Sequence, residues 1–150
     1  MIEFTKGNIV EADTEAVVNT VNCLGVCGKG VALEFKKVFP DNYKAYRKHC
    51  EDRRLKPGKL FVYVQSRGKE LGNLVIINLA TKDNWRNDSR IEWIKNGLEE
   101  LRNLIVDLQL CSVAMPKIGC GNGNLSWDEV KQLVIEFAES LPKTRIVVYE

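Results

Sequence analysis

The distribution of hydrophobic residues divides this chain into two kinds of segment. Short runs rich in Val, Ile and Leu are apolar on both faces, which is typical of strands buried inside a sheet. Longer segments carry apolar residues at helical spacing. The predicted strands are residues 2–4, 16–22, 60–65, 74–79, 110–116 and 143–150, and the predicted helices are residues 31–39, 41–53, 91–108 and 126–137.

A few local signals predict where helices begin and end. Pro40 is expected to end one helix, because proline cannot continue the hydrogen bonding of a helix interior. Asp41 then fits the N-cap of the next helix. Ser126 and Glu129 have the Ser-x-x-Glu spacing of a capping box. Since strands and helices alternate in the second half, we predict an α/β fold: one three-layer α/β/α domain over residues 1–150, with a mixed, mostly parallel central sheet.

The composition is that of an ordinary globular protein, with 45% hydrophobic and 28% charged residues. A net charge of +2 excludes a global field that would grip nucleic acid non-specifically. Five cysteines without a CxxC pair and a single histidine form no convincing zinc set, so no metal is expected. Cys23 and Cys27 fit a redox pair, although small half-buried loop thiols explain them better. Without a secretory leader or a long apolar run, we expect a cytoplasmic protein with no membrane segment.

The segment from residue 17 to residue 33 combines a predicted strand, a glycine-rich turn and the start of a helix near Val31. Glycines let a ligand approach the backbone closely, and the helix start adds unpaired N–H donors with a partial positive charge. Such a turn suits a phosphate or diphosphate. It is neither a P-loop nor a dinucleotide fingerprint. A tight strand-to-helix connection without a ligand is the alternative.

Three polar loops, residues 22–30, 81–89 and 117–125, each follow an apolar strand. In open α/β sheets ligands bind at the carboxyl ends of the strands, so we expect these loops to meet around one cleft. The two glycine-rich loops could clasp two phosphates. Asn22 would face sugar hydroxyls at the mouth, and Lys82 would project into the same cleft. Lys29 could balance phosphate charge or be an ordinary solvated lysine.

Four segments carry a resemblance to a known family: residues 18–22 (Val-Asn-Thr-Val-Asn), 28–36, 76–85 and 116–127. They resemble macrodomains, most closely the macrodomain of DarG-type antitoxins and more distantly the human terminal ADP-ribose glycohydrolase. The likeness covers nearly the whole chain. It implies a macrodomain fold, ADP-ribose as ligand, no cofactor, and removal of ADP-ribose from thymidine in DNA, which reverses a DarT-like toxin. The alternatives are a non-catalytic ADP-ribose reader and a hydrolase of glutamyl-ADP-ribose esters or ADP-ribose-1″-phosphate.

The resemblance also implies roles for individual residues. Lys82 matches the catalytic lysine, and Asn22 matches an asparagine at the distal ribose, so both are predicted as catalytic. In the human relative an acidic residue assists the lysine, but Gly123 stands at about that place here. Whether Lys82 acts as nucleophile, as base or by positioning the leaving base stays open. The predicted ADP-ribose contacts are Asn8, Ile9, Asn19, Gly28, Lys29, Gly30, Val31, Thr81, Ile118, Gly119, Cys120, Gly121, Asn122 and Gly123.

Trp85, Arg86 and Arg90 form a local basic-aromatic patch after the predicted catalytic lysine. A flipped or single-stranded base could stack on Trp85, so Trp85 and Arg86 are predicted DNA contacts. The alternative is that Trp85 pins its loop onto the core. DNA as the modified substrate therefore rests mainly on the family resemblance. We expect a monomer.

Overall fold

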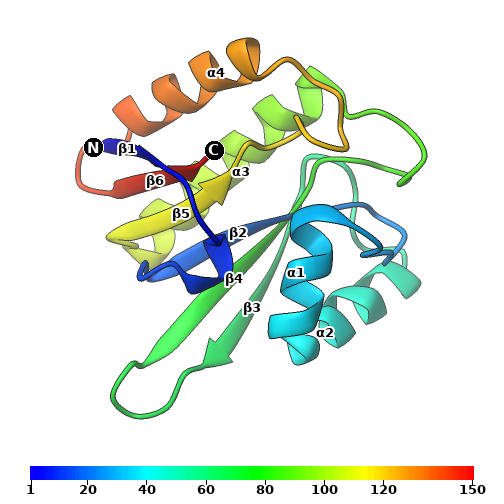
Figure 1. The fold of residues 1–150 in the computed structure, drawn as a ribbon, viewed down its shortest axis with the longest axis horizontal. Coiled ribbons are helices and arrows are strands. Elements are labelled where there is room, and N and C mark those ends of the chain that lie inside the picture. The colour runs from blue at the N-terminus through cyan, green and yellow to red at the C-terminus, as the bar shows by residue number, and fades with distance from the viewer.

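The central element of the fold is a six-stranded sheet with the strand order β1-β6-β5-β2-β4-β3 (Figure 1). The computed structural model describes all 150 residues. Neighbouring strands are parallel except β3, which runs antiparallel to β4 at one edge. The prediction of a mixed, mostly parallel sheet is therefore confirmed. The strands are β1 (Ile2–Thr5), β2 (Ala16–Val21), β3 (Leu60–Ser66), β4 (Asn73–Ala80), β5 (Ser112–Pro116) and β6 (Arg145–Tyr149).

Four α-helices cover the two faces of the sheet (Figure 1). The first pair, α1 and α2, lies on one face, and the second pair, α3 and α4, lies on the other. This is the predicted three-layer arrangement. None of the helices combines the length and the apolar character needed to cross a membrane. The helices are α1 (Gly30–Val38), α2 (Pro40–Glu51), α3 (Ile91–Leu108) and α4 (Trp127–Glu139), with a short 3₁₀ helix η1 (Ile9–Glu11) that the sequence did not indicate.

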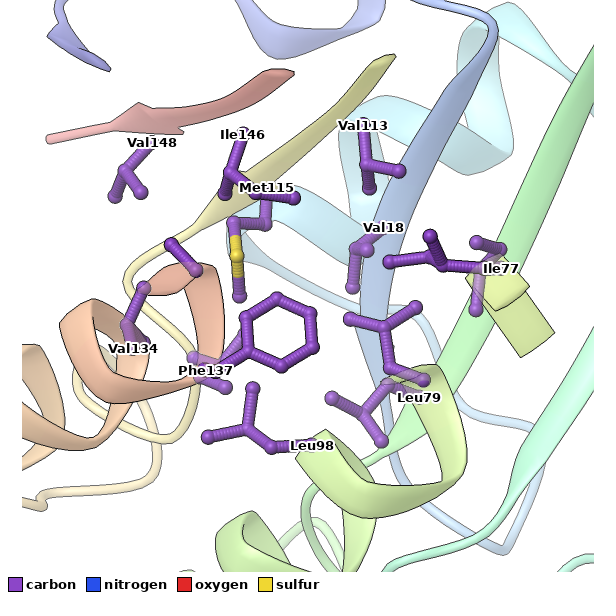
Figure 2. Close-up of a cluster of buried hydrophobic side chains, with 14 of the residues drawn as sticks. Val18, Ile77, Leu79, Leu98, Val113, Met115, Val134, Phe137, Ile146 and Val148 are labelled. Atoms are coloured by element: carbon purple, nitrogen blue, oxygen red, sulfur yellow. The ribbon is translucent and has the colours of Figure 1, made fainter. Parts of the chain in front are cut away.

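The largest part of the core lies between the sheet and the second helix pair (Figure 2). Val18, Ile77 and Met115 point from the central strands toward this layer, where they meet Leu98 of α3 and Phe137 of α4. The strand residues are fully buried. Burial of this apolar surface is the main driving force for folding, at about 25 cal/mol per Å². It fixes the strands from which the loops of the site emerge.

The opposite face of the sheet is packed differently, because a layer of buried amides separates two smaller apolar clusters. Asn19 of β2 donates from Nδ2 to Oδ1 of Asn78 on β4 at 3.0 Å. Asn78 in turn exchanges hydrogen bonds with Asn42 of α2, at 2.9 and 3.3 Å. All three side chains are buried, and these bonds pair their amide groups except for Oδ1 of Asn19, which has no hydrogen-bond partner. The amide layer ties α2 to the two central strands.

The structure confirms one predicted helix boundary and contradicts two predicted caps. The first helix ends at Val38, before Pro40 as predicted, and Pro40 is also the first residue of α2, where its fixed φ is favourable and its missing N–H costs nothing. Phe39 is the N-cap, and Asp41 lies in the first turn, where its charge complements the helix dipole. Ser126 is the N-cap of α4, but its side chain makes no capping hydrogen bond, so no capping box forms.

Candidate functional site

A cleft of about 1000 Å³ opens at the edge of the sheet where the parallel strands end. The loops after β2, β4 and β5 line it, as the strand pattern predicts, together with residues after β1 and at the end of β6. Parallel pairing brings these strand ends together, since Val21 pairs with Ala80 and Pro116 with Tyr149. The cleft is therefore a direct consequence of the sheet topology.

The first glycine turn presents the start of α1 to the cleft. Gly30 begins the helix with a φ of +66°, a conformation that glycine adopts without strain. Lys29 precedes it as the N-cap and makes no side-chain capping bond. The first N–H groups of α1 thus have no intrahelical acceptor and lie beside the cleft. This end of the cleft suits a negatively charged group.

The second glycine turn approaches the first from the other side. A Cβ on Gly30 would lie 2.9 Å from Nδ2 of Asn122, so the two turns pass within contact distance. Gly123 is enclosed, because a Cβ there would overlap the carbonyl oxygen of Gly119 and Oγ of Ser89. Gly121, in contrast, borders open space, and a Cβ there would meet no protein atom within 4 Å. The turn is thus fixed at Gly123 and open at Gly121, where it lines the cleft.

Lys82 lies in the cleft wall just after β4, with only 9% of its surface exposed. Its ammonium donates to the carbonyl oxygen of Trp85 at 3.3 Å and takes part in no ion pair. Burial lowers the pKa of Lys82, Lys29 lowers it further, and Asp88 opposes the change. A buried lysine without a carboxylate partner contributes little to the stability of the fold. Its lowered pKa makes the neutral amine, which is the nucleophile or base, easier to form.

Asn22 is held in place by the loop that it begins. Its Oδ1 accepts from the N–H groups of Leu24 and Val26 at 2.9 and 3.3 Å and from the hydroxyl of Tyr46 at 3.1 Å. Its Nδ2 donates to the carbonyl oxygen of Val26 at 2.8 Å. Only one amide N–H is left for a ligand. In this structure the side-chain hydrogen bonds of Asn22 mainly fix the conformation of the first glycine loop.

Tyr46 of α2 supports this asparagine, and no pattern in the sequence indicated the contact. Its buried hydroxyl donates to the backbone oxygen of Asn22 at 2.7 Å as well as to Oδ1. Burial raises the pKa of Tyr46 above its ordinary range, so the hydroxyl stays protonated and can donate.

We expect Tyr46→Phe to lower the stability of the fold by about 1–2 kcal/mol, because the backbone oxygen of Asn22 loses its closest donor, while Oδ1 keeps the N–H groups of Leu24 and Val26. At about 2–4 °C per kcal/mol for a chain of this size, the midpoint of thermal unfolding should fall by roughly 2–8 °C. Tyr43→Phe is the matched control, since Tyr43 makes one longer bond, 3.2 Å, to the oxygen of Gly25. Equal losses in both variants would contradict a special role for Tyr46.

The far end of the cleft is lined by residues 7–9 and by Tyr149 and Glu150. Asn8 uses its Oδ1 to accept from the N–H of Val10, as the N-cap of η1. The carboxylate of Glu150 accepts from Nε1 of Trp127 at 2.9 Å, which lowers its pKa. The strand-end rule that placed the three loops would also have found Tyr149 and Glu150, because β6 ends at the same edge.

Most of the predicted site residues meet in this cleft, but three do not. Asn19 is outside the lining and donates to Asn78 in the buried amide layer; the part of β2 that lines the cleft begins one residue later, with Thr20 and Val21. Ile118 is fully buried in the large core cluster. Arg86 is outside the lining and lies over the ring of Trp85, 4.9 Å from its centre. The predicted residues that line the cleft are Asn8, Ile9, Asn22, Gly28, Lys29, Gly30, Val31, Thr81, Lys82, Trp85, Gly119, Cys120, Gly121, Asn122 and Gly123.

No three His, Cys, Asp or Glu side chains gather closely enough to hold a metal ion. The cysteines near the cleft are also poor candidates for redox chemistry. Burial raises the pKa of Cys23 to about 12 and that of Cys27 and Cys120 to about 11. Since the thiolate is the reactive form, these thiols are inert at neutral pH. The buried lysine is the reactive group that the cleft offers.

The Macro domain family matches residues 18–134 of this chain. The chain is a macrodomain. It is 48% identical over 150 residues to a DNA ADP-ribosyl glycohydrolase of Thermus aquaticus, covering 100% of the macrodomain and 41% of that protein. The macrodomain thus spans about two fifths of the length of the curated relatives it matches.

Solved structures agree with this assignment. The macrodomain of Mycobacterium tuberculosis DarG is 42% identical, with a TM-score of 0.93, and the match covers 99% of this macrodomain and 97% of that chain. Thermosipho africanus DarTG in complex with ADP-ribose is 27% identical, with a TM-score of 0.87, covering 99% and 41% of the two chains. The predicted fold class and family are therefore confirmed.

Proposed function

We propose that this macrodomain binds ADP-ribose and hydrolyses its bond to the thymine base of DNA, which reverses the action of a DarT-like toxin. One observation carries the proposal: a buried lysine without a carboxylate partner lies in the wall of a cleft between two glycine turns. The names of the relatives support it, since curated proteins of 43–48% identity are DNA ADP-ribosyl glycohydrolases. A Thermosipho relative is named as a fusion of the transferase and the glycohydrolase.

The lining of the cleft offers a place for each part of ADP-ribose. The diphosphate would lie between the two glycine turns, where Gly30 starts α1 and Gly121 borders open space. Adenine would occupy the end near Asn8 and Ile9. The distal ribose would then face Asn22 and Lys82 at the other end. The turns would bind phosphate through neutral N–H groups, which is effective in a partly enclosed site.

Cleavage replaces the base at ribose C1″ with a hydroxyl group from water, and the departing thymine takes up a proton. The transition state resembles an oxocarbenium ion, so nearby phosphate and amide groups stabilise it. No pair of carboxylates suited to ordinary glycosidase chemistry lines the cleft near Lys82. A neutral Lys82 amine is the group that could accept a proton from the sugar or attack C1″ of an opened ribose.

Trp85 gives the site a place for the base. It lines the mouth of the cleft, is 44% exposed, and its backbone oxygen accepts the hydrogen bond from Lys82. An indole that pinned its loop onto the core would be buried. Arg86 lies over one face of this exposed ring, and an unstacked base would stack on the other face. Trp85 and Arg86 are therefore retained as proposed DNA contacts.

The decisive experiment offers two substrates in parallel: an oligonucleotide ADP-ribosylated on one thymidine, and a protein ADP-ribosylated on glutamate. We expect release of ADP-ribose from the oligonucleotide and little from the protein. Release from the protein alone would show that the substrate is a glutamyl ester. No release from either substrate, with free ADP-ribose still binding in calorimetry, would leave a reader module as the function.

We expect the single-turnover rate to rise with pH below neutrality, about tenfold per unit, and to level off at a pH lower than the ordinary pKa of lysine, ~10.4. The reason is that burial and Lys29 lower the pKa of Lys82, so its neutral form becomes available earlier. Lys29→Ala should move the plateau to higher pH, because it removes one of the two causes. A rate independent of pH from 5 to 9 would argue for Lys82 as a fixed positive charge.

A further inference from the structure

A second surface borders the cleft beyond Trp85, and of its cations only Arg86 has a role in the proposed function. It consists of the loop between α2 and β3, residues 52–59, and the end of the loop between β4 and α3. Five exposed cations belong to it, and we call these the basic strip: Arg53, Arg54, Lys56, Arg86 and Arg90.

The cations of the basic strip are not neutralised by the protein. None of them takes part in an ion pair, although their neighbours Lys48 and Lys59 pair with Asp52 and Glu100 at 3.2 and 2.6 Å. The chain as a whole carries a net charge of only +2, so this concentration of free positive charge is local. Such a concentration attracts a polyanion rather than an isolated charge.

Acidic side chains in the same loops cancel only part of this charge. Asp52 is paired with Lys48. Asp83 and Asp88 take part in no ion pair, and Asp88 accepts a hydrogen bond from the neutral amide of Asn124 at 2.9 Å. Five cations therefore stand against two unpaired carboxylates.

Aromatic rings alternate with these cations. Arg86 lies over the ring of Trp85, 4.9 Å from its centre, and Arg90 lies over the ring of Trp93 at 5.2 Å. Trp85 is exposed and Trp93 is partly exposed. Arginine and aromatic faces side by side are what single-stranded nucleic acid binds, because bases stack on the rings while phosphates contact the cations.

The basic strip is continuous with the cleft. Lys56 lies near enough to lower the pKa of Cys23, and the N–H of Cys23 donates to the oxygen of Asp83 at 3.1 Å. Gly58 donates to the oxygen of Ala80 at 2.7 Å and packs against Trp93, where a Cβ would lie 3.3 Å from the backbone oxygen. The two loops therefore lie side by side at the end of the sheet that carries the cleft (Figure 1).

We propose that the basic strip binds the sugar-phosphate backbone of single-stranded DNA next to the modified nucleotide, which guides the modified base to Trp85 and Lys82. This inference rests on the proposed function and extends it from a modified nucleoside to a strand. The strand must be single, because its bases have to leave a duplex before they can stack on Trp85 and Trp93. The cleft would then hold ADP-ribose while the strip holds flanking phosphates.

The test compares two substrates of different length: ADP-ribosylated thymidine as a nucleoside, and the same thymidine at the centre of a nine-residue single strand. The variant Arg54→Glu with Lys56→Glu changes two exposed cations. It leaves Arg53 intact, because Arg53 has a left-handed backbone with φ of 55°, where a substitution could change the loop as well as the charge. The matched control is Lys69→Glu with Lys143→Glu, which makes the same charge change at the opposite edge of the sheet.

In the wild type, we expect a KM at least tenfold lower for the strand than for the nucleoside, with similar kcat. The KM of the strand should depend on salt with a slope corresponding to about −0.7 per phosphate contact, or roughly −2 in log affinity for three contacts. The Arg54→Glu, Lys56→Glu variant should lose this advantage and most of the salt dependence, while its kcat and KM for the nucleoside stay within twofold of wild type. The control should behave as wild type on both.

Equal KM values for strand and nucleoside in the wild type would overturn the inference, and so would equal losses in the variant and the control. Stronger binding after a complementary strand is annealed would overturn it as well, because it would show that the basic strip binds duplex DNA and not a single strand. Failure of the proposed function is distinguishable, because a protein without this activity would release ADP-ribose from neither DNA substrate. In that case anisotropy with an unmodified single strand still tests the strip: wild type and control should bind it, and the variant should not.

Discussion

Lys82→Ala should slow release of ADP-ribose from modified thymidine by a factor of about 10² to 10⁴, the range expected when a group that moves a proton is removed. Affinity for free ADP-ribose should stay within about tenfold, or ~1.4 kcal/mol, because the glycine turns bind most of the ligand. Single-turnover rates and calorimetry on the same preparation measure the two effects. Full turnover in this variant would place catalysis elsewhere, with Asn22 the first residue to examine.

Two further substitutions separate the roles that Lys82 could have. Lys82→Arg should fail nearly as badly as Ala, because arginine stays protonated and is neither nucleophile nor base. Restored turnover with Arg would mean that a fixed positive charge is sufficient. Lys82→Met keeps the volume and removes the charge, so it should be inactive and at least as stable as wild type, since an unpaired buried ammonium is costly. A clear fall in its unfolding temperature would show that the ammonium stabilises the fold instead.

The part of the site that could be predicted follows from periodicity and sheet topology. Apolar strands followed by polar loops placed residues 22–30, 81–89 and 117–125 at one edge, and the structure brings them together there. The order of the strands in the sheet did not have to be known for this, because parallel strands with helical crossovers end on the same side. The same reasoning located Lys82 on the cleft wall.

What could not be predicted depends on which way single side chains point. Asn19 and Asn22 are three residues apart at the end of one strand, yet Asn19 belongs to a buried amide layer and Asn22 to a loop. Alternation along a strand separates adjacent positions, but a residue beyond the strand end follows no such rule. Tyr46 is a more distant case, because its contact with Asn22 spans 24 residues and depends on how α2 packs. Composition and spacing carry no signal for such contacts.

Glycine positions illustrate the same limit, since the sequence shows three glycines in the second turn and the structure gives two of them opposite roles. Gly123 is enclosed by Gly119 and Ser89, whereas Gly121 faces open space. Gly123→Ala should therefore disturb the turn itself. Overpacking of this kind costs about 1–3 kcal/mol, so the unfolding temperature should fall by several degrees and binding should weaken with it.

Gly121→Val should leave the unfolding temperature within about 1 °C of wild type, because a Cβ there meets no protein atom within 4 Å and Gly121 does not have a left-handed backbone. If the diphosphate lies against this turn, the side chain occupies the space that the ligand needs and holds it away from the backbone N–H groups. Affinity for ADP-ribose should then fall about 100-fold, or ~2.7 kcal/mol. Calorimetry and thermal unfolding on this variant and on Gly123→Ala separate a blocked cleft from a damaged turn. Wild-type affinity in Gly121→Val would show that the ligand does not touch the second glycine turn, and the diphosphate would have to be placed against the start of α1 alone.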